Sequence, residues 1–142
     1  MKFSSKGVNS ILRLVWVIVW ACVLAYFTCS VDPFHFHISY FHFTGRPHWR
    51  DLLLIDFHFL QPLYLISKIG HFCGFMIFDL LLFNLIRRST PSACIAIALG
   101  IASELFQLGF GRDGRLYDMV IDALGVGVSV WLQKKLWTNH GR

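Results

Sequence analysis

The chain has 142 residues, of which 56% are hydrophobic and only 15% are charged, and its formal net charge is +5. A soluble globular domain carries about 25% charged residues, so this composition excludes an ordinary soluble enzyme and indicates a membrane protein. The length allows one compact unit. We therefore predict a single membrane domain over residues 1–142.

Four apolar runs follow one another along the chain, each near the length of about 20 residues that a helix needs to cross a bilayer. The first, residues 11–31, has one charge, Arg13, near its start. No A-x-A cleavage pattern follows it, so we predict an uncleaved helix rather than a signal peptide. The other runs cover residues 64–86, 92–110 and 116–137. The sequence thus predicts an all-α, four-helix transmembrane bundle.

The connection between the first two runs, residues 32–63, is rich in phenylalanine and histidine. Its last part, DLLLIDFHFLQP at residues 51–62, predicts a short helix at the membrane interface. Aromatic residues at this density are typical of headgroup depth. A metal site is the alternative, but no cysteines or spaced carboxylates accompany the histidines, so we predict no metal ion and no other cofactor. The histidines concerned are His35, His37, His42, His48 and His58.

Basic residues predict the orientation of the four helices. Eight of them belong to one side of the membrane and four to the other, and by the positive-inside rule the larger group is cytoplasmic. Both termini are then cytoplasmic, and the Phe/His-rich loop faces outward. The positive charge fits attraction to anionic lipid rather than to nucleic acid, since no basic soluble domain is present. The larger group is Lys2, Lys6, Arg13, Arg87, Arg88, Lys134, Lys135 and Arg142, and the smaller is Arg46, Arg50, Arg112 and Arg115.

Polar residues interrupt the last three runs at matching depths. Glu104 and Gln107 are three residues apart, and Asp118 and Asp122 are four apart, so each pair shares a helix face. At 1.5 Å per residue, Glu104 and His71 both lie roughly 10 Å below the outer ends of their helices. Ionisable groups inside a membrane helix face the bundle interior or water. We therefore predict one polar pocket in the outer third of the bilayer, covered by the GRDGR loop.

Packing is the competing interpretation of these polar residues, because polar side chains also hold membrane helices together. Several carboxylates and a histidine are costly for that purpose, which favours a functional pocket. Asp79 lies deeper, and we interpret it as a separate polar contact. Small residues four apart, such as Gly70 with Gly74 and Gly125 with Ser129, predict close helix packing and no chemistry.

The polar segments of residues 68–129 resemble the VanZ-like family of membrane proteins. KIGHFCGF resembles the family's K-x-x-H-F segment, ELFQ its E-x-x-Q segment, and Gly111–Arg112 followed by Asp118 its G-R…D segment. Three features depart from the family: Asp122 stands where asparagine is frequent, Ser103 stands where an acidic residue is frequent, and no proline precedes Gly111. The resemblance implies a small bacterial integral membrane protein of the cell envelope. The family's founding member is associated with resistance to the glycopeptide antibiotic teicoplanin.

Two classes of mechanism stay open at this point. In the first, which we favour, the chain binds an envelope lipid or a drug without chemistry. In the second it is a membrane enzyme acting on a lipid-linked or amphiphilic substrate by acid–base catalysis. The same residues serve both, and no oligomeric state is predicted. The expected acid–base residues are His71, Glu104 and Asp118, and the expected substrate-binding residues are Lys68, Gln107, Arg112 and Arg115.

Overall fold

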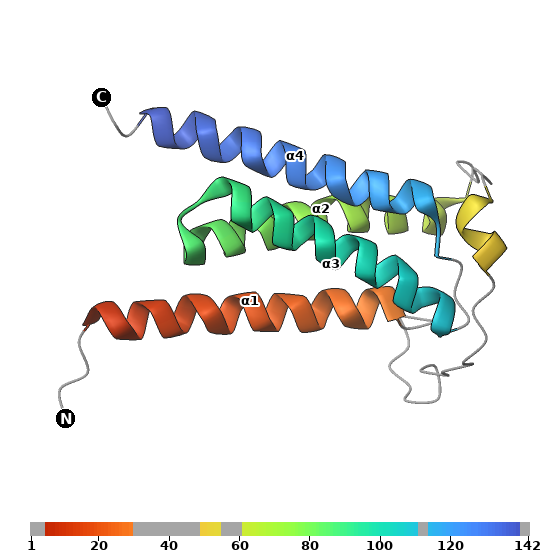
Figure 1. The fold of residues 1–142 in the computed structure, drawn as a ribbon, viewed down its shortest axis with the longest axis horizontal. Helices are drawn as coiled ribbons and strands as arrows, with labels where there is room; N and C mark the ends of the chain where they lie inside the picture. The colour runs from red at the N-terminus through yellow and green to blue at the C-terminus, as the bar shows by residue number, and fades with distance from the viewer. Residues whose placement is uncertain (1–4, 30–48, 55–60, 111–113, 140–142) are drawn as a thin grey trace.

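A computed structural model of the chain describes residues 5–29, 49–54, 61–110 and 114–139. These residues form four α-helices and one short 3-10 helix and include no strand, which confirms the predicted all-α class (Figure 1). Each α-helix contains a stretch long and apolar enough to cross a membrane, with a mean hydropathy that falls from 2.1 in the first helix to 1.2 in the last. The elements are α1 (Ser5–Cys29), η2 (Trp49–Leu53), α2 (Pro62–Ile86), α3 (Ser89–Gly109) and α4 (Leu116–Asn139).

Helices that are consecutive in the chain run antiparallel, and α2 lies at the centre, in contact with α1, α3 and α4 (Figure 1). Only Arg87 and Arg88 separate α2 from α3. Arg87 adopts a left-handed conformation with φ 62°, and its backbone N–H donates to the carbonyl of Phe83. This cap closes α2 and reverses the chain within two residues. The end of the bundle at which α3 ends and α4 begins is called the α3–α4 end below.

The centre of the bundle is built mainly from aromatic and aliphatic side chains of α2. Phe75 is fully buried, and Phe78 and Leu82 are nearly so. Val126 of α4 and Ala96 of α3 pack against them in one cluster. The opposite faces of the helices carry exposed apolar residues, including Trp16, Val120 and Trp131. An apolar exterior around a packed interior is the surface that lipid chains solvate.

Glycines set how closely the helices approach. A Cβ atom at Gly125 would collide with the carbonyl oxygen of Phe72, so α4 touches the backbone of α2 at this point. Gly74 faces Leu24 of α1, and its carbonyl accepts a hydrogen bond of 3.0 Å from the indole N–H of Trp20. Gly70 and Gly127 have no neighbouring atom within 4 Å of a built Cβ. Only some of the small residues predicted to mediate packing therefore do so within the chain.

The helix bounds differ from the predicted ones mainly at the starts. α1 begins at residue 5 rather than 11, because polar residues such as Asn9 and Ser10 continue the helix beyond its apolar part. α3 begins at Ser89, which places Pro91 inside the first turn, where a missing N–H costs no helical hydrogen bond. The 3-10 helix η2 overlaps only the first three residues, 51–53, of the stretch predicted as an interfacial helix. Most of the Phe/His-rich loop, namely residues 32–48 and 55–60, lies outside the described residues.

Candidate functional site

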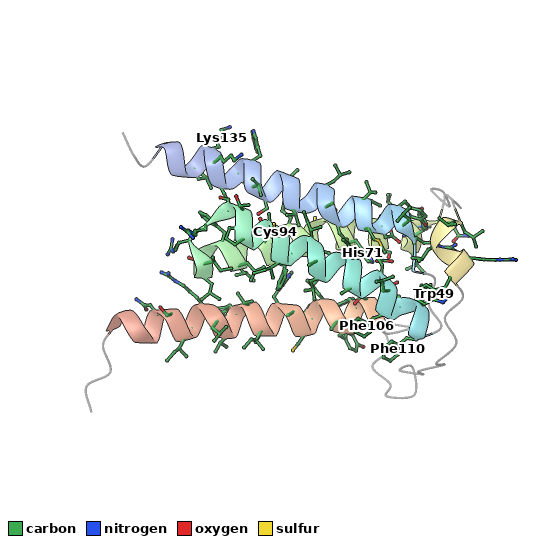
Figure 2. The ribbon with its side chains drawn as sticks, in the orientation of Figure 1. Trp49, His71, Cys94, Phe106, Phe110 and Lys135 are labelled. Atoms are coloured by element: carbon green, nitrogen blue, oxygen red, sulfur yellow. The ribbon has the colours of Figure 1, made fainter. Side chains whose placement is uncertain are left out.

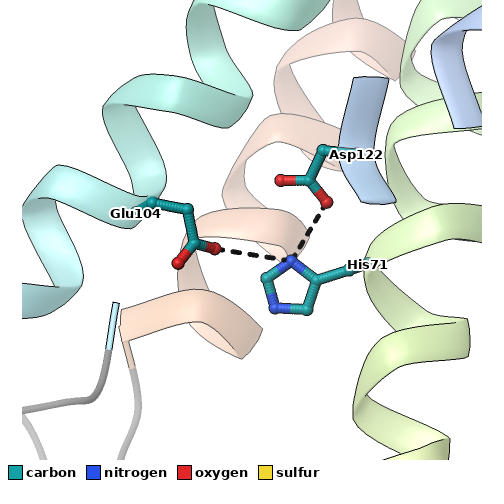
Figure 3. A group of neighbouring side chains, drawn as sticks. All are labelled: His71, Glu104 and Asp122. Carbon is teal, nitrogen blue, oxygen red and sulfur yellow. Dashed lines mark hydrogen bonds and ion pairs between the residues drawn. The ribbon is translucent and has the colours of Figure 1, made fainter. Parts of the chain in front are cut away.

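Three ionisable side chains from three different helices meet toward the α3–α4 end of the bundle. His71 comes from α2, Glu104 from α3 and Asp122 from α4 (Figure 3). The imidazole Nδ1 lies 3.1 Å from Asp122 Oδ1 and 3.6 Å from Glu104 Oε1. Glu104 and Asp122 are 0% and 1% exposed, and the His71 side chain is 10% exposed. These three residues are named the His71 cluster.

The position of the cluster along the bundle follows from the chain direction. His71 lies toward the end that carries Trp49 and Phe110, whereas Lys135 lies at the opposite end (Figure 2). α2 and α4 both start at the α3–α4 end and run parallel, so His71 and Asp122 meet at nearly the same depth. α3 arrives at this end from the other direction, which places Glu104 near its last turns.

The carboxylate of Glu104 is held on both of its oxygens. Oε1 accepts a hydrogen bond of 3.1 Å from the side-chain amide of Gln107, and Oε2 accepts one of 2.9 Å from the backbone N–H of Arg115. The E-x-x-Q spacing puts the first donor on the same helix face. The second donor comes close because residue 114 is glycine: a Cβ there would collide with the carbonyl of Glu104. The carboxylate is thus oriented before anything binds.

Nearer the α3–α4 end, Lys68 and Asp118 form an ion pair. The Nζ atom of Lys68 lies 2.7 Å from Asp118 Oδ2, and the two side chains are 16% and 5% exposed. The ammonium also lies 4.8 Å from the centre of the Tyr64 ring and 4.7 Å from that of the Tyr117 ring. Cation–π contacts at these distances strengthen as water is removed. The charge of Lys68 is therefore largely satisfied within the protein.

The structure places the predicted residues that it describes in two neighbouring groups. His71 and Glu104 are neighbours, Gln107 positions Glu104, and Asp118 holds Lys68. Two further residues were expected to bind substrate. Arg115 is buried and reaches Glu104 through its backbone N–H. Arg112 lies outside the described residues.

Asp122 was omitted from the predicted site, yet it makes the shortest contact with His71. The available signal was its position four residues after Asp118, on the same face of α4 and one turn deeper. The resembled family often has asparagine at this position, which argues against Asp122 as a residue that contacts a ligand. The parallel register of α2 and α4 pairs residue 68 with 118 and residue 71 with 122, and this register could not be inferred from the local pattern.

A second buried polar group lies deeper along the same two helices. Asp79 of α2 accepts hydrogen bonds from the Ser129 hydroxyl at 2.6 Å and the Gln133 amide at 2.7 Å. All three residues are buried, and a hydrogen bond of 3.0 Å joins Gln133 to Ser129. This Asp79 network is separate from the His71 cluster, with Phe75 and Val126 of the apolar core at intermediate positions on the two helices. It provides a matched buried carboxylate for comparison.

Among known proteins, the chain is 35% identical over 89 residues to the "Uncharacterized membrane protein YwnJ" of Bacillus subtilis (strain 168). The alignment covers 62% of this chain and 64% of that relative, less than two thirds of its length. No protein-family model and no solved structure matches the chain, so the resemblance to VanZ-like proteins stays a prediction. Together with the four apolar helices, the likeness shows an integral membrane protein.

Proposed function

We propose that the chain is a VanZ-like protein of the bacterial cytoplasmic membrane that binds the polar head of an amphiphilic envelope molecule at the His71 cluster. The observation that carries the proposal is the burial of this cluster: one ionisable side chain from each of three membrane helices meets inside the bundle. Ionisable groups at membrane depth are expensive and mark ligand or ion sites. Helix association alone needs only small or uncharged polar residues.

The distribution of basic residues supports a site that opens to the outer leaflet. Eight of the thirteen lysines and arginines would flank the cytoplasmic side, which puts both termini there and the α3–α4 end outside. Arg112 belongs to the connection at that end, where a guanidinium fork suits a phosphate or carboxylate of a headgroup. A membrane lipid or lipid-linked precursor reaches such a site from within the bilayer, and a drug such as teicoplanin reaches it from outside.

Lipid binding is tested by purifying the full chain in mild detergent and identifying the lipids that co-purify by mass spectrometry. The wild type is compared with Glu104→Gln, which removes a charge from the cluster and keeps its shape. Asp79→Asn is the matched control, because Asp79 is equally buried on α2 but belongs to the separate network. We expect one amphiphile to be enriched with the wild type and with Asp79→Asn, and to be lost with Glu104→Gln.

The same variants test the link to resistance. Cells that produce the wild type should tolerate more teicoplanin than cells that produce Glu104→Gln at the same protein level. Identical lipid profiles for all three proteins, together with identical drug susceptibility, would show that the cluster has only a packing role.

One contact favours the second candidate, a membrane enzyme. The pairing of His71 Nδ1 with Asp122 directs the imidazole so that Nε2, the other ring nitrogen, is the atom left to take a proton from a substrate. A carboxylate that orients a histidine in this way is a recurrent feature of general-base catalysis. An enzyme would change the amount of a lipid-linked precursor in cells, and His71→Gln would reverse this change. A binder would leave the precursor pools as they are.

A further inference from the structure

The side chains of the His71 cluster lie close enough together to surround one metal ion. One possible ligand atom each of His71, Glu104 and Asp122 lies within 4.8 Å of the other two. Two of the separations are 3.1 Å and 3.6 Å. Nitrogen and oxygen ligands at about 2.1 Å from a tetrahedral zinc ion lie about 3.4 Å apart. Figure 3 shows the imidazole nitrogen between the two carboxylates.

Hydrogen bonding alone does not satisfy this arrangement. The Nδ1 atom carries at most one proton, which it donates to one acceptor. Asp122 Oδ1 lies within hydrogen-bond distance at 3.1 Å, whereas the 3.6 Å to Glu104 Oε1 is too long for a hydrogen bond. The other oxygen of Asp122, Oδ2, is buried and has no hydrogen-bond partner within the described part of the chain, as is also true of one carboxylate oxygen each of Asp79 and Asp118. A buried acceptor without a partner is destabilising and requires an explanation.

The charges of the cluster are also unbalanced. Two buried carboxylates face one imidazole, and the ion pairs of both carboxylates within the described residues are with His71. Lys68, the next cation along α2, is bound to Asp118. A divalent cation would take the place of the Nδ1 proton. The net charge of the neutral imidazole, the two carboxylates and the ion would then be zero. Buried charges are retained in proteins where they are paired or bind a metal.

The surroundings hold the ligands as a metal site requires. Gln107 and the backbone N–H of Arg115 fix the carboxylate plane of Glu104. Outer partners of this kind orient metal-binding carboxylates and histidines. On α3, Gly100 leaves room for Asp122, since a Cβ there would lie 3.3 Å from Asp122 Oδ2. The ligand set therefore comes from three helices and is fixed by their packing.

We propose that His71, Glu104 and Asp122 bind a divalent first-row transition-metal ion, with Zn²⁺ or Mn²⁺ matching one imidazole and two carboxylates. The sequence alone predicted no metal ion, and that prediction was based on the histidines of the Phe/His-rich loop rather than on this cluster. Three protein ligands leave at least one coordination position open. An oxygen of the amphiphile's headgroup fills that open position. The identity of this ligand rests on the proposed function.

The test measures metal content independently of any amphiphile. The full chain, purified in detergent and treated with a chelator, is dialysed against Zn²⁺ or Mn²⁺ and analysed by elemental mass spectrometry. We expect one ion per chain for the wild type and for Asp79→Asn, and none for Glu104→Gln or Asp122→Asn. Gln107→Met, which removes only an orienting donor, should weaken metal binding about tenfold. Co²⁺ in place of Zn²⁺ should give visible absorption bands that Asp122→Asn abolishes.

Each variant is first checked for helix content and thermal unfolding, so that loss of metal is scored only in folded protein. A folded wild type without metal, or an equal loss of metal in Asp79→Asn and Asp122→Asn, would overturn the metal site. Lipid enrichment that persists in metal-free wild type would leave the proposed lipid binding intact while removing the metal. One bound ion per chain in protein that enriches no lipid would support the metal site and contradict the proposed lipid binding.

Discussion

Replacing Gly125 by alanine should separate the two helices that carry most of the buried polar contacts. The added Cβ would collide with the carbonyl oxygen of Phe72 and would lie 3.1 Å from its carbonyl carbon and 3.3 Å from its Cα. All three are backbone atoms of α2, which cannot rotate away as a side chain can. We expect α4 to move from α2 by roughly 1 Å, because packed interiors accommodate an added methyl group only by such shifts.

The expected cost combines three contributions. Overpacking of a filled interior typically costs about 1–3 kcal/mol. A shift of α4 also lengthens the contact between His71 and Asp122, now 3.1 Å, and weakening it costs about 1 kcal/mol. Alanine returns about 1 kcal/mol, because it favours the helix more than glycine does. The net loss of unfolding free energy for Gly125→Ala is therefore about 1–3 kcal/mol.

Gly127 offers a matched control on the same helix. A Cβ there meets no atom within 4 Å, so Gly127→Ala should keep stability or raise it by up to about 1 kcal/mol. The assay is unfolding of the purified protein in mixed detergent micelles, followed by tryptophan fluorescence and helix content. If the two variants unfold at the same denaturant concentration, α4 does not rest on the backbone of α2 and the reasoning is refuted.

Three further predictions concern the site and the topology. Lys68→Met should destabilise the fold by about 3 kcal/mol, because Asp118 is left as an unpaired buried charge. Adding Asp118→Asn should restore most of the lost stability. Equal stability of the single and double variants in the same unfolding assay would contradict this prediction. Gly114→Ala should weaken metal and lipid binding, because the added Cβ would push the backbone N–H of Arg115 away from Glu104. Full binding by this variant in the metal and lipid assays would show that this N–H does not orient Glu104 for binding. In a chain without native cysteines, Thr138→Cys should resist a membrane-impermeant maleimide in intact cells, and labelling there would reverse the assigned orientation.

The helices and the depth of the site residues along them could be predicted, because both depend on local properties of the sequence. A run of apolar residues specifies a membrane helix by its length and composition. The rise per residue then gives the depth of His71 and Glu104, and the spacing of Glu104 and Gln107 gives a shared face. These arguments need no knowledge of how the helices are rotated about their axes. They predict a shared depth only, and in the structure His71 Nδ1 lies 3.6 Å from Glu104 Oε1.

The partner of each polar group could not be predicted in the same way. Asp118 and Asp122 share a face of α4, so the sequence pattern does not decide which of them meets His71. The choice depends on the register of α2 against α4, which the close contact at Gly125 helps to fix. The Asp79 network is a stronger case, because its partner Ser129 is an ordinary polar residue of a helix that the sequence gives no reason to single out.

The parallel pairing of α2 with α4 has a consequence for how the chain enters the membrane during synthesis. α4 is the least apolar of the four spans, with a mean hydropathy of 1.2, and it carries two buried aspartates. An aspartate near the centre of a lone helix adds about 2.5–3.5 kcal/mol to the free energy of insertion, and one in the first turn, as Asp118 is, adds less. The groups that compensate them, Lys68 and His71, lie on α2 and leave the ribosome about 50 residues earlier. We therefore expect α2 to remain beside the translocon until α4 emerges, so that for this helix insertion and tertiary folding are a single event.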